Sequence, residues 1–183
     1  MQNYKTTLLR LNLAVIAFLI VFTLVSLHNL PEQIPTHFGA DGTPDAYSKN
    51  VQTWWFMLLG LVVFLNVVIF ASSRLMRRFP RLVNFPGKKK VLQLPEQLRE
   101  EAFVVVDVWL LSIMLVINIL FTYMQWMTAS VARGYAKGIS PYFVIFLILL
   151  MLALSGFFWV NVKKEVEKLK ERVSPLGPRE EER

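Results

Sequence analysis

The sequence predicts an all-α membrane protein with four transmembrane helices. Its 183 residues are 55% hydrophobic, with a mean hydropathy of +0.46, which is more apolar surface than the core of one small soluble domain buries. The apolar residues gather in four segments, at about 8–27, 54–72, 102–127 and 142–162. Each segment has the roughly 20 residues that a helix needs to cross about 30 Å of hydrocarbon.

The spans are predicted to be helices, because the bilayer core offers no water to bond an open backbone. The apolar stretch of the first span, Leu11 to Leu27, follows Lys5 and Arg10, as the apolar region of a signal peptide would. It is longer than such a region, and no small-x-small cleavage motif follows it. We therefore expect a retained signal anchor, with a cleaved signal peptide as the alternative.

Lysine and arginine residues predict how the chain is oriented in the membrane. All of them except Lys49, Arg133 and Lys137 lie at the N-terminal end, between the second and third spans, or after the fourth span. Because cytoplasmic segments of membrane proteins carry an excess of these residues, both termini are predicted to be cytoplasmic (N-in and C-in). The segment 30–49, between the first two spans, is then an outer loop.

The outer loop is predicted to be ordered and to act as a recognition element. Two prolines four residues apart, Pro31 and Pro35, stiffen its entry. Asp41-Gly42 is a strong turn signal in which the glycine supplies a positive φ. The residues that we assign to recognition are Pro31, Pro35, His37, Phe38, Asp41, Gly42 and Asp45.

Both histidines of the chain, His28 and His37, lie at or in this loop, together with Asp41. Nitrogen and oxygen donors suit several transition metals, so these three residues are candidate metal ligands. Their spacing matches no established ligand motif. The alternatives are a histidine that bonds to the backbone and an aspartate that caps its own turn. No cofactor is predicted.

The loop also carries a family resemblance. The run Leu-Pro-x-x-Ile-Pro-x-His-Phe-x-x-x-Gly extends from Leu30 to Gly42 and is continued by Pro-Asp and by Ser-Lys, up to Lys49. It closely resembles the signature of a bacterial membrane module, a domain of unknown function, found at the N-terminus of SdpI-type immunity proteins. The stretch Asn-Phe-Pro-Gly-Lys, which begins at Asn84, is similar to the Asn-x-Pro-x-Lys stretch often seen between the second and third spans of such proteins.

Proteins of the SdpI type protect cells from the sporulation-delay toxin and recruit a repressor to the membrane. They carry further spans after this module. The resemblance implies a multi-pass protein of the bacterial inner membrane with a role in immunity or signal transduction, here as a short four-span form. It supplies no catalytic residues.

Three polar residues, Asn66, Asp107 and Asn118, are predicted to lie inside the bilayer. An ionisable group at this depth is costly and usually functional. Asn66 and Asp107 lie at similar distances from the predicted inner ends of consecutive antiparallel spans, which predicts a hydrogen bond between them. Thr122 and Gln125 continue the polar track outward. We expect the track to join helices; a proton or ion relay through Asp107 is the alternative.

Residues 1–162 are predicted to form one transmembrane domain, followed at 163–183 by a cytoplasmic amphipathic helix and a tail. One apolar stripe with helical spacing comprises Val162, Val166, Leu169 and Val173. The stripe would dock a partner, lie on the lipid surface, or belong to a solvated helix that frays. The end at 179–183 is predicted to be disordered.

The sequence lacks the motifs of common enzymes. With no cysteine, no Gly-x-Ser-x-Gly and no glycine-rich phosphate loop, the protein is predicted not to be an enzyme. Its basic residues flank spans instead of forming a soluble face, so no nucleic acid is expected. We expect an interaction protein of the lipid bilayer that meets a protein or peptide. The alternatives are a structural subunit of a larger complex, with oligomerisation left open, and a small transporter that uses Asp107.

Overall fold

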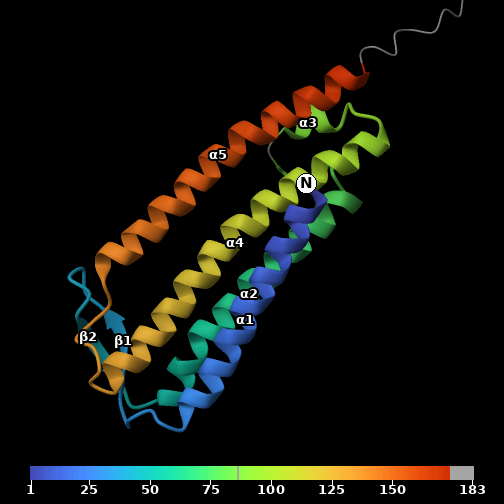
Figure 1. Cartoon of the computed structure of the whole chain (residues 1–183). Coiled ribbons are helices and arrows are strands. Elements are labelled where there is room, and N and C mark those ends of the chain that lie inside the picture. The colour runs from blue at the N-terminus through green and yellow to red at the C-terminus, as the bar shows by residue number, and fades with distance from the viewer. Residues whose placement is uncertain (86, 174–183) are drawn as a thin grey trace, which may run out of the picture.

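The computed structural model describes residues 1–85 and 87–173, and four long helices dominate this part of the chain (Figure 1). The long helices are α1 (Gln2–Leu27), α2 (Val51–Arg78), α4 (Glu96–Ala132) and α5 (Pro141–Val173). A hairpin joins α1 to α2, and a short helical turn precedes α4. The strands are β1 (Ile34–Phe38) and β2 (Pro44–Ser48), and the turn is α3 (Lys88–Val91).

Each long helix contains a stretch long and apolar enough to cross a membrane, with mean hydropathies from 2.4 to 2.7. This confirms the four predicted spans and indicates a multi-pass membrane protein. The helices also continue past the predicted span ends. Helix α4, with 37 residues, is about 55 Å long at 1.5 Å per residue, against about 30 Å of hydrocarbon. Charged residues near the span ends are therefore held on helices.

Helix α4 is the centre of the arrangement. Half of its most apolar stretch is buried, whereas the share is 17% in α1 and 6% in both α2 and α5. Figure 1 shows α5 along one side of α4, and α1 with α2 along the other side. We call residues 28–50 and 133–140 the hairpin end, and residues 79–85, 87–95 and 163–173 the basic end. These segments lie at opposite ends of the long helices (Figure 1).

The loop between α1 and α2 departs from the all-α prediction, because it forms a two-stranded antiparallel sheet. Ile34 pairs with Ser48, and Phe38 pairs with Pro44. The turn between the strands is closed by a hydrogen bond from Gly39 N to Thr43 O of 2.8 Å. Gly42 has φ of +81°, as the Asp-Gly turn signal predicts. Backbone pairing across this turn, rather than prolines alone, makes the loop regular.

The basic end has its own hydrophobic core, built where the long helices pass the predicted span ends. The apolar stripe of α5 is buried there at Val162, Val166 and Leu169. Its partners include Phe85, Val91, Leu94, Ala102 and Phe103. These three positions therefore pack within the chain, so neither a partner, a lipid surface nor solvent is needed to cover them. The side chain of Val173 lies outside the described part of the chain. Residues 174–183, with the tail predicted to be disordered, lie outside the described residues.

Candidate functional site

A cluster of charged residues surrounds Asp107 near the basic end. The carboxylate of Asp107 is 3% exposed and accepts a hydrogen bond from Arg77 Nη2 at 2.6 Å. Lys5 Nζ lies 2.6 Å from Asp107 Oδ2, and Ser73 Oγ donates to Asp107 Oδ1 at 2.6 Å. Helices α1, α2 and α4 thus meet at one buried carboxylate.

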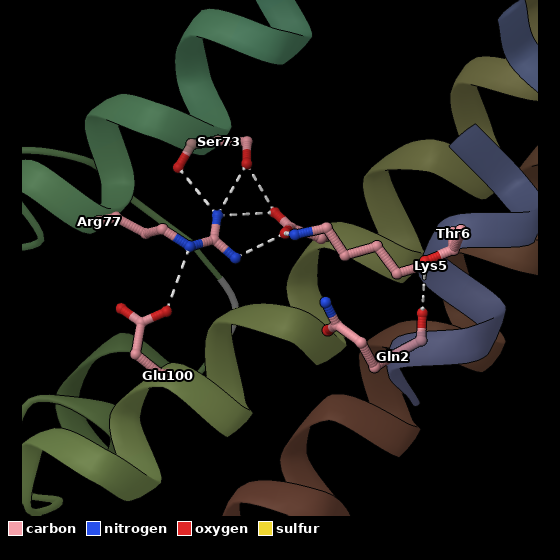
Figure 2. A network of polar contacts seen from close by, with 7 residues as sticks. Gln2, Lys5, Thr6, Ser73, Arg77 and Glu100 are labelled. Atoms are coloured by element: carbon pink, nitrogen blue, oxygen red, sulfur yellow. Dashed lines mark hydrogen bonds and ion pairs between the residues drawn. The ribbon is translucent and has the colours of Figure 1, made fainter. Parts of the chain in front are cut away.

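A second carboxylate completes the charge balance of this cluster. Figure 2 shows Arg77 between Ser73 and Glu100, with Lys5 approaching from the facing helix. Arg77 Nε donates to Glu100 Oε2 at 3.4 Å, so two cations face two carboxylates. A buried charge is tolerated when it is paired and hydrogen-bonded in this way. The arrangement can hold three helices together without any bound ion.

The predicted hydrogen bond between Asp107 and Asn66 is wrong. Hydropathy assigned Arg77 to the loop, but α2 continues to Arg78, which places Arg77 in the last helical turn. Its long side chain reaches back to Asp107, and a guanidinium–carboxylate pair is stronger than a bond to a neutral amide. Asn66 instead donates to Asn118 Oδ1 at 2.9 Å.

Three asparagines from three helices form a second layer. Asn118 Nδ2 donates to Asn12 Oδ1 at 2.8 Å, and the Asn66 bond adds helix α2. Asn12 Nδ2 also donates to Leu111 O at 3.0 Å. Asn12 and Asn118 are buried. In hydrocarbon, bonds of this kind between helices are worth about 0.6 kcal/mol on average, and they specify which residues lie level with each other.

A third layer lies closer to the hairpin end. Trp55 Nε1 donates to Thr23 O at 2.8 Å, and Gln125 Nε2 donates to Trp55 O at 3.0 Å. Arg133 then closes the end of α1 by donating to Ser26 O at 3.0 Å. We call the three layers together the polar column. Its members are Lys5, Asn12, Thr23, Trp55, Asn66, Ser73, Arg77, Asp107, Asn118 and Gln125.

Sequence reasoning found only part of the polar column. It singled out Asn66, Asp107 and Asn118, with Gln125 further outward on the same track. The structure brings Asn66 and Asn118 together and bonds Gln125 to Trp55 O, while Asp107 has other partners. It did not assign Lys5 or Arg77 to the site, since both lie at span ends where basic residues are expected in any case. One signal could have indicated Arg77. It follows Ser73 by four residues, about one helical turn, so the two side chains lie on the same face of α2.

The base of the hairpin is fixed by apolar packing. Ile34, the first residue of β1, is buried against Trp55 and Ala129. Pro35 is buried as well. Trp55 belongs both to this cluster and to the polar column, so the hairpin rests directly on the three-helix unit. The Ile-Pro pair of the loop signature therefore has a structural role.

The tip of the hairpin is clamped to the connection between α4 and α5. Ile139 N donates to Gly42 O at 2.8 Å. A Cβ atom on Gly42 would lie 1.8 Å from Ile139 O, and one on Gly138 would lie 2.2 Å from Gly42 O. Both contacts are too short for any side chain, so this approach requires glycine at both positions. The tip thereby links the first loop to the start of α5.

Asp41 caps its own turn. Thr43 N donates to Asp41 Oδ1 at 3.0 Å, and the Thr43 hydroxyl donates to the same carboxylate at 2.8 Å. The backbone bond from Thr43, followed by its side-chain bond, lowers the pKa of Asp41 below its usual value of 3.8. Of the two roles considered for Asp41, this geometry matches the turn cap.

The candidate metal ligands are not gathered into a site. His37 Nδ1 lies 2.6 Å from Asp45 Oδ1, and their side chains are 69% and 51% exposed. His28 caps the C-terminus of α1. No group of three or more His, Cys, Asp or Glu residues that could hold a metal ion occurs within residues 1–85 and 87–173. The His37–Asp45 pair instead joins the two strands side by side.

The predicted recognition residues fall into two classes. Pro35 and Gly42 are buried and Phe38 is half-buried, so they support the hairpin. The exposed members are Pro31, His37, Asp41 and Asp45. Tyr47, which sequence reasoning did not select, is also exposed on β2. His37, Asp45 and Tyr47 form what we call the hairpin face.

Comparisons with known proteins match the segment of the chain that contains the hairpin. Residues 14–61 match a family described as a domain of unknown function (DUF1648); they cover part of α1, the hairpin and part of α2. An uncharacterized protein of Archaeoglobus fulgidus is 35% identical over 82 residues, which are 44% of this chain and 45% of that protein. The chain thus matches less than half the length of this curated relative. No solved structure gives a significant match.

Proposed function

We propose that the chain is a non-enzymatic membrane interaction protein whose hairpin face binds a protein or peptide partner. The supporting observation is the contrast within the hairpin. Its base is packed on Trp55 and its tip is clamped to Ile139, while His37 and Tyr47 remain exposed. A surface that is already rigid loses little conformational entropy when a partner binds.

The hairpin is proposed to face the outer side of the membrane, with both termini in the cytoplasm. Of the 20 lysines and arginines, 17 lie at the N-terminal end, between the second and third spans, or after the fourth span, whereas the hairpin end has Lys49, Arg133 and Lys137. Of these, Arg133 is used to bind the backbone carbonyls of Ser26 and Asn29. This asymmetry supports an N-in, C-in topology.

The resemblance to SdpI-type proteins supports a role in immunity or signalling at a bacterial inner membrane. The residues that carry it, from Leu30 to Lys49, are those of the hairpin and its two ends. The DUF1648 match over residues 14–61 includes the same segment. Toxin binding or repressor recruitment would be specific forms of the proposed interaction.

The transporter alternative receives less support from the contacts of Asp107. Its carboxylate is held by Lys5, Ser73 and Arg77 at once. A relay group has to exchange a proton or ion during each cycle, and two basic side chains in direct contact with the carboxylate oppose that exchange. We therefore favour a structural role for Asp107.

Affinity purification in mild detergent tests the proposed function. The full chain is expected to retain a partner that is lost from the double variant His37→Ala and Tyr47→Ala. Tyr135→Ala is the control, because Tyr135 is 81% exposed in the other connection of the hairpin end. Equal retention by the double variant and by the unchanged protein would rule out the hairpin face.

A further inference from the structure

A hollow lies between α1 and α4 on the side of the bundle. Its volume is about 560 Å³, and it is lined by α1 residues between Ala14 and Phe22 and α4 residues between Ile119 and Trp126. Both segments belong to helices apolar enough to cross a membrane. The hollow therefore opens toward hydrocarbon. Its volume is in the range of pockets that hold one small apolar molecule.

The polar atoms in the lining are already used by the protein. Thr122 Oγ1 donates to Asn118 O at 2.7 Å, and the Tyr123 hydroxyl accepts a hydrogen bond from Ser140 N at 3.0 Å. The exception is the indole N–H of Trp126, which has no partner among the described residues. Trp126 is 56% exposed, and it lies one residue before the end of the predicted third span, 102–127.

The residue types in the lining indicate whether a lipid chain or a further helix occupies the hollow. Helices that pack closely in membranes meet at small residues, which allow their backbones to approach. Here the walls carry Phe18, Phe22, Tyr123 and Trp126, and Phe18 and Phe22 are stacked with ring centroids 6.1 Å apart. Such walls suit a flexible chain better than a second helix. A tryptophan at the end of a span also lies where lipid ester groups begin.

We propose that this hollow binds one lipid acyl chain, with the lipid ester group at Trp126. The site contacts both supports of the hairpin. Phe22 packs against the cluster of Ile34 and Trp55, and Tyr123 holds Ser140, next to Ile139 of the tip clamp. An acyl chain in the hollow therefore packs beneath the hairpin. This binding does not depend on what the hairpin face recognises.

Photo-crosslinking in vesicles tests the proposal. The full chain is reconstituted in phosphatidylethanolamine and phosphatidylglycerol with a phosphatidylethanolamine that carries a diazirine on one acyl chain. We expect adducts to concentrate on 14–22 and 119–126, several-fold above those on 148–157 of α5.

Two filling variants and one control identify the site. Ala14→Phe fills the hollow from α1, and Ile119→Trp fills it from α4, so the test does not depend on either variant alone. Each is expected to lower the adducts several-fold. Ala153→Phe adds the same bulk as Ala14→Phe at an exposed position of α5 and is expected to change nothing. Equal labelling of α5, unchanged adducts in both filling variants, or crosslinks to a second copy in place of lipid would overturn the proposal.

Discussion

Helix α4 is held differently on its two sides. On the side of α1 and α2, directional hydrogen bonds and ion pairs follow one another along the polar column, from Asp107 to Gln125. On the side of α5, the described side-chain contacts concentrate at the two ends. Val166 is buried in the core of the basic end, and Tyr123 packs on Phe143 near the hairpin end with ring centroids 4.4 Å apart.

This difference between the two sides follows from the medium around the helices, which is lipid within the spans and water beyond them. Inside the bilayer, lipid is as apolar as leucine, so burying apolar side chains gives little drive for helices to associate. Polar bonds can still specify neighbours and register there. At the basic end, beyond the spans, water restores the hydrophobic effect, and the stripe of α5 is buried. Ion pairs such as Arg172 with Glu101, at 3.2 Å, lie at the rim of that core.

The largest effect is expected from a variant on the side of α4 that faces α1 and α2. Asp107→Ala leaves Lys5 and Arg77 without their buried partner, which is expected to lower the free energy of unfolding by about 3 kcal/mol. Denaturant titration in micelles, followed by tryptophan fluorescence, measures the loss.

Asp107→Asn should cost less, because the amide can still bond with Ser73. Asn161→Ala is the control, since within the described residues Asn161 donates to Phe157 O of its own helix, at 2.8 Å, and to no other helix. If Asp107→Ala costs no more than Asn161→Ala, the cluster does not hold the helices together.

The next effect tests the α5 side. Leu169→Ala opens a cavity in the core of the basic end and is expected to cost about 2 kcal/mol. Amide exchange should rise in 162–173 and stay unchanged in α1 and α2. Leu152→Ala, at an exposed position of the same helix, should leave exchange unaltered. A rise throughout the chain would show that the two sides of α4 unfold together.

A smaller effect is expected from the middle layer. Asn118→Leu removes the bonds to Asn12 and Asn66 and should cost about 1 kcal/mol. A double-mutant cycle with Asn66→Leu is expected to give a coupling energy of about 0.6 kcal/mol. Additive costs would mean that this layer fills space without specifying register.

The smallest effect concerns the turn that connects the hairpin to the α5 side. The pKa of Asp41 is lower in the folded protein than its usual 3.8, so the carboxylate stabilises the turn above that pH. This stabilisation is lost as the pH falls through the lowered pKa. The NMR shift of the Thr43 amide should therefore stay constant from neutral pH to about pH 4 and change below it.

Asp41→Asn is expected to abolish the acid transition of the Thr43 amide, whereas Asp45→Asn should preserve it. A transition that persists in Asp41→Asn would assign it to another group.

The positions of the four spans and of the Asp41-Gly42 turn followed from the sequence. Hydropathy is a property of a local window, and the positive φ of Gly42 follows from two adjacent residues. Membrane insertion and the turn need no distant partner. The polar residues within the spans could also be identified from the sequence, because any Asn or Asp in such an apolar window is unusual.

The pairing of these residues was decided only by the tertiary structure. Asp107 takes Arg77 and Lys5 rather than Asn66, because the end of α2 and the reach of each side chain set which groups are level. The stripe of α5 and the clamp between Gly42 and Ile139 likewise join segments far apart in the chain. Local patterns state which side chains need a partner; packing in three dimensions determines which partner each one meets.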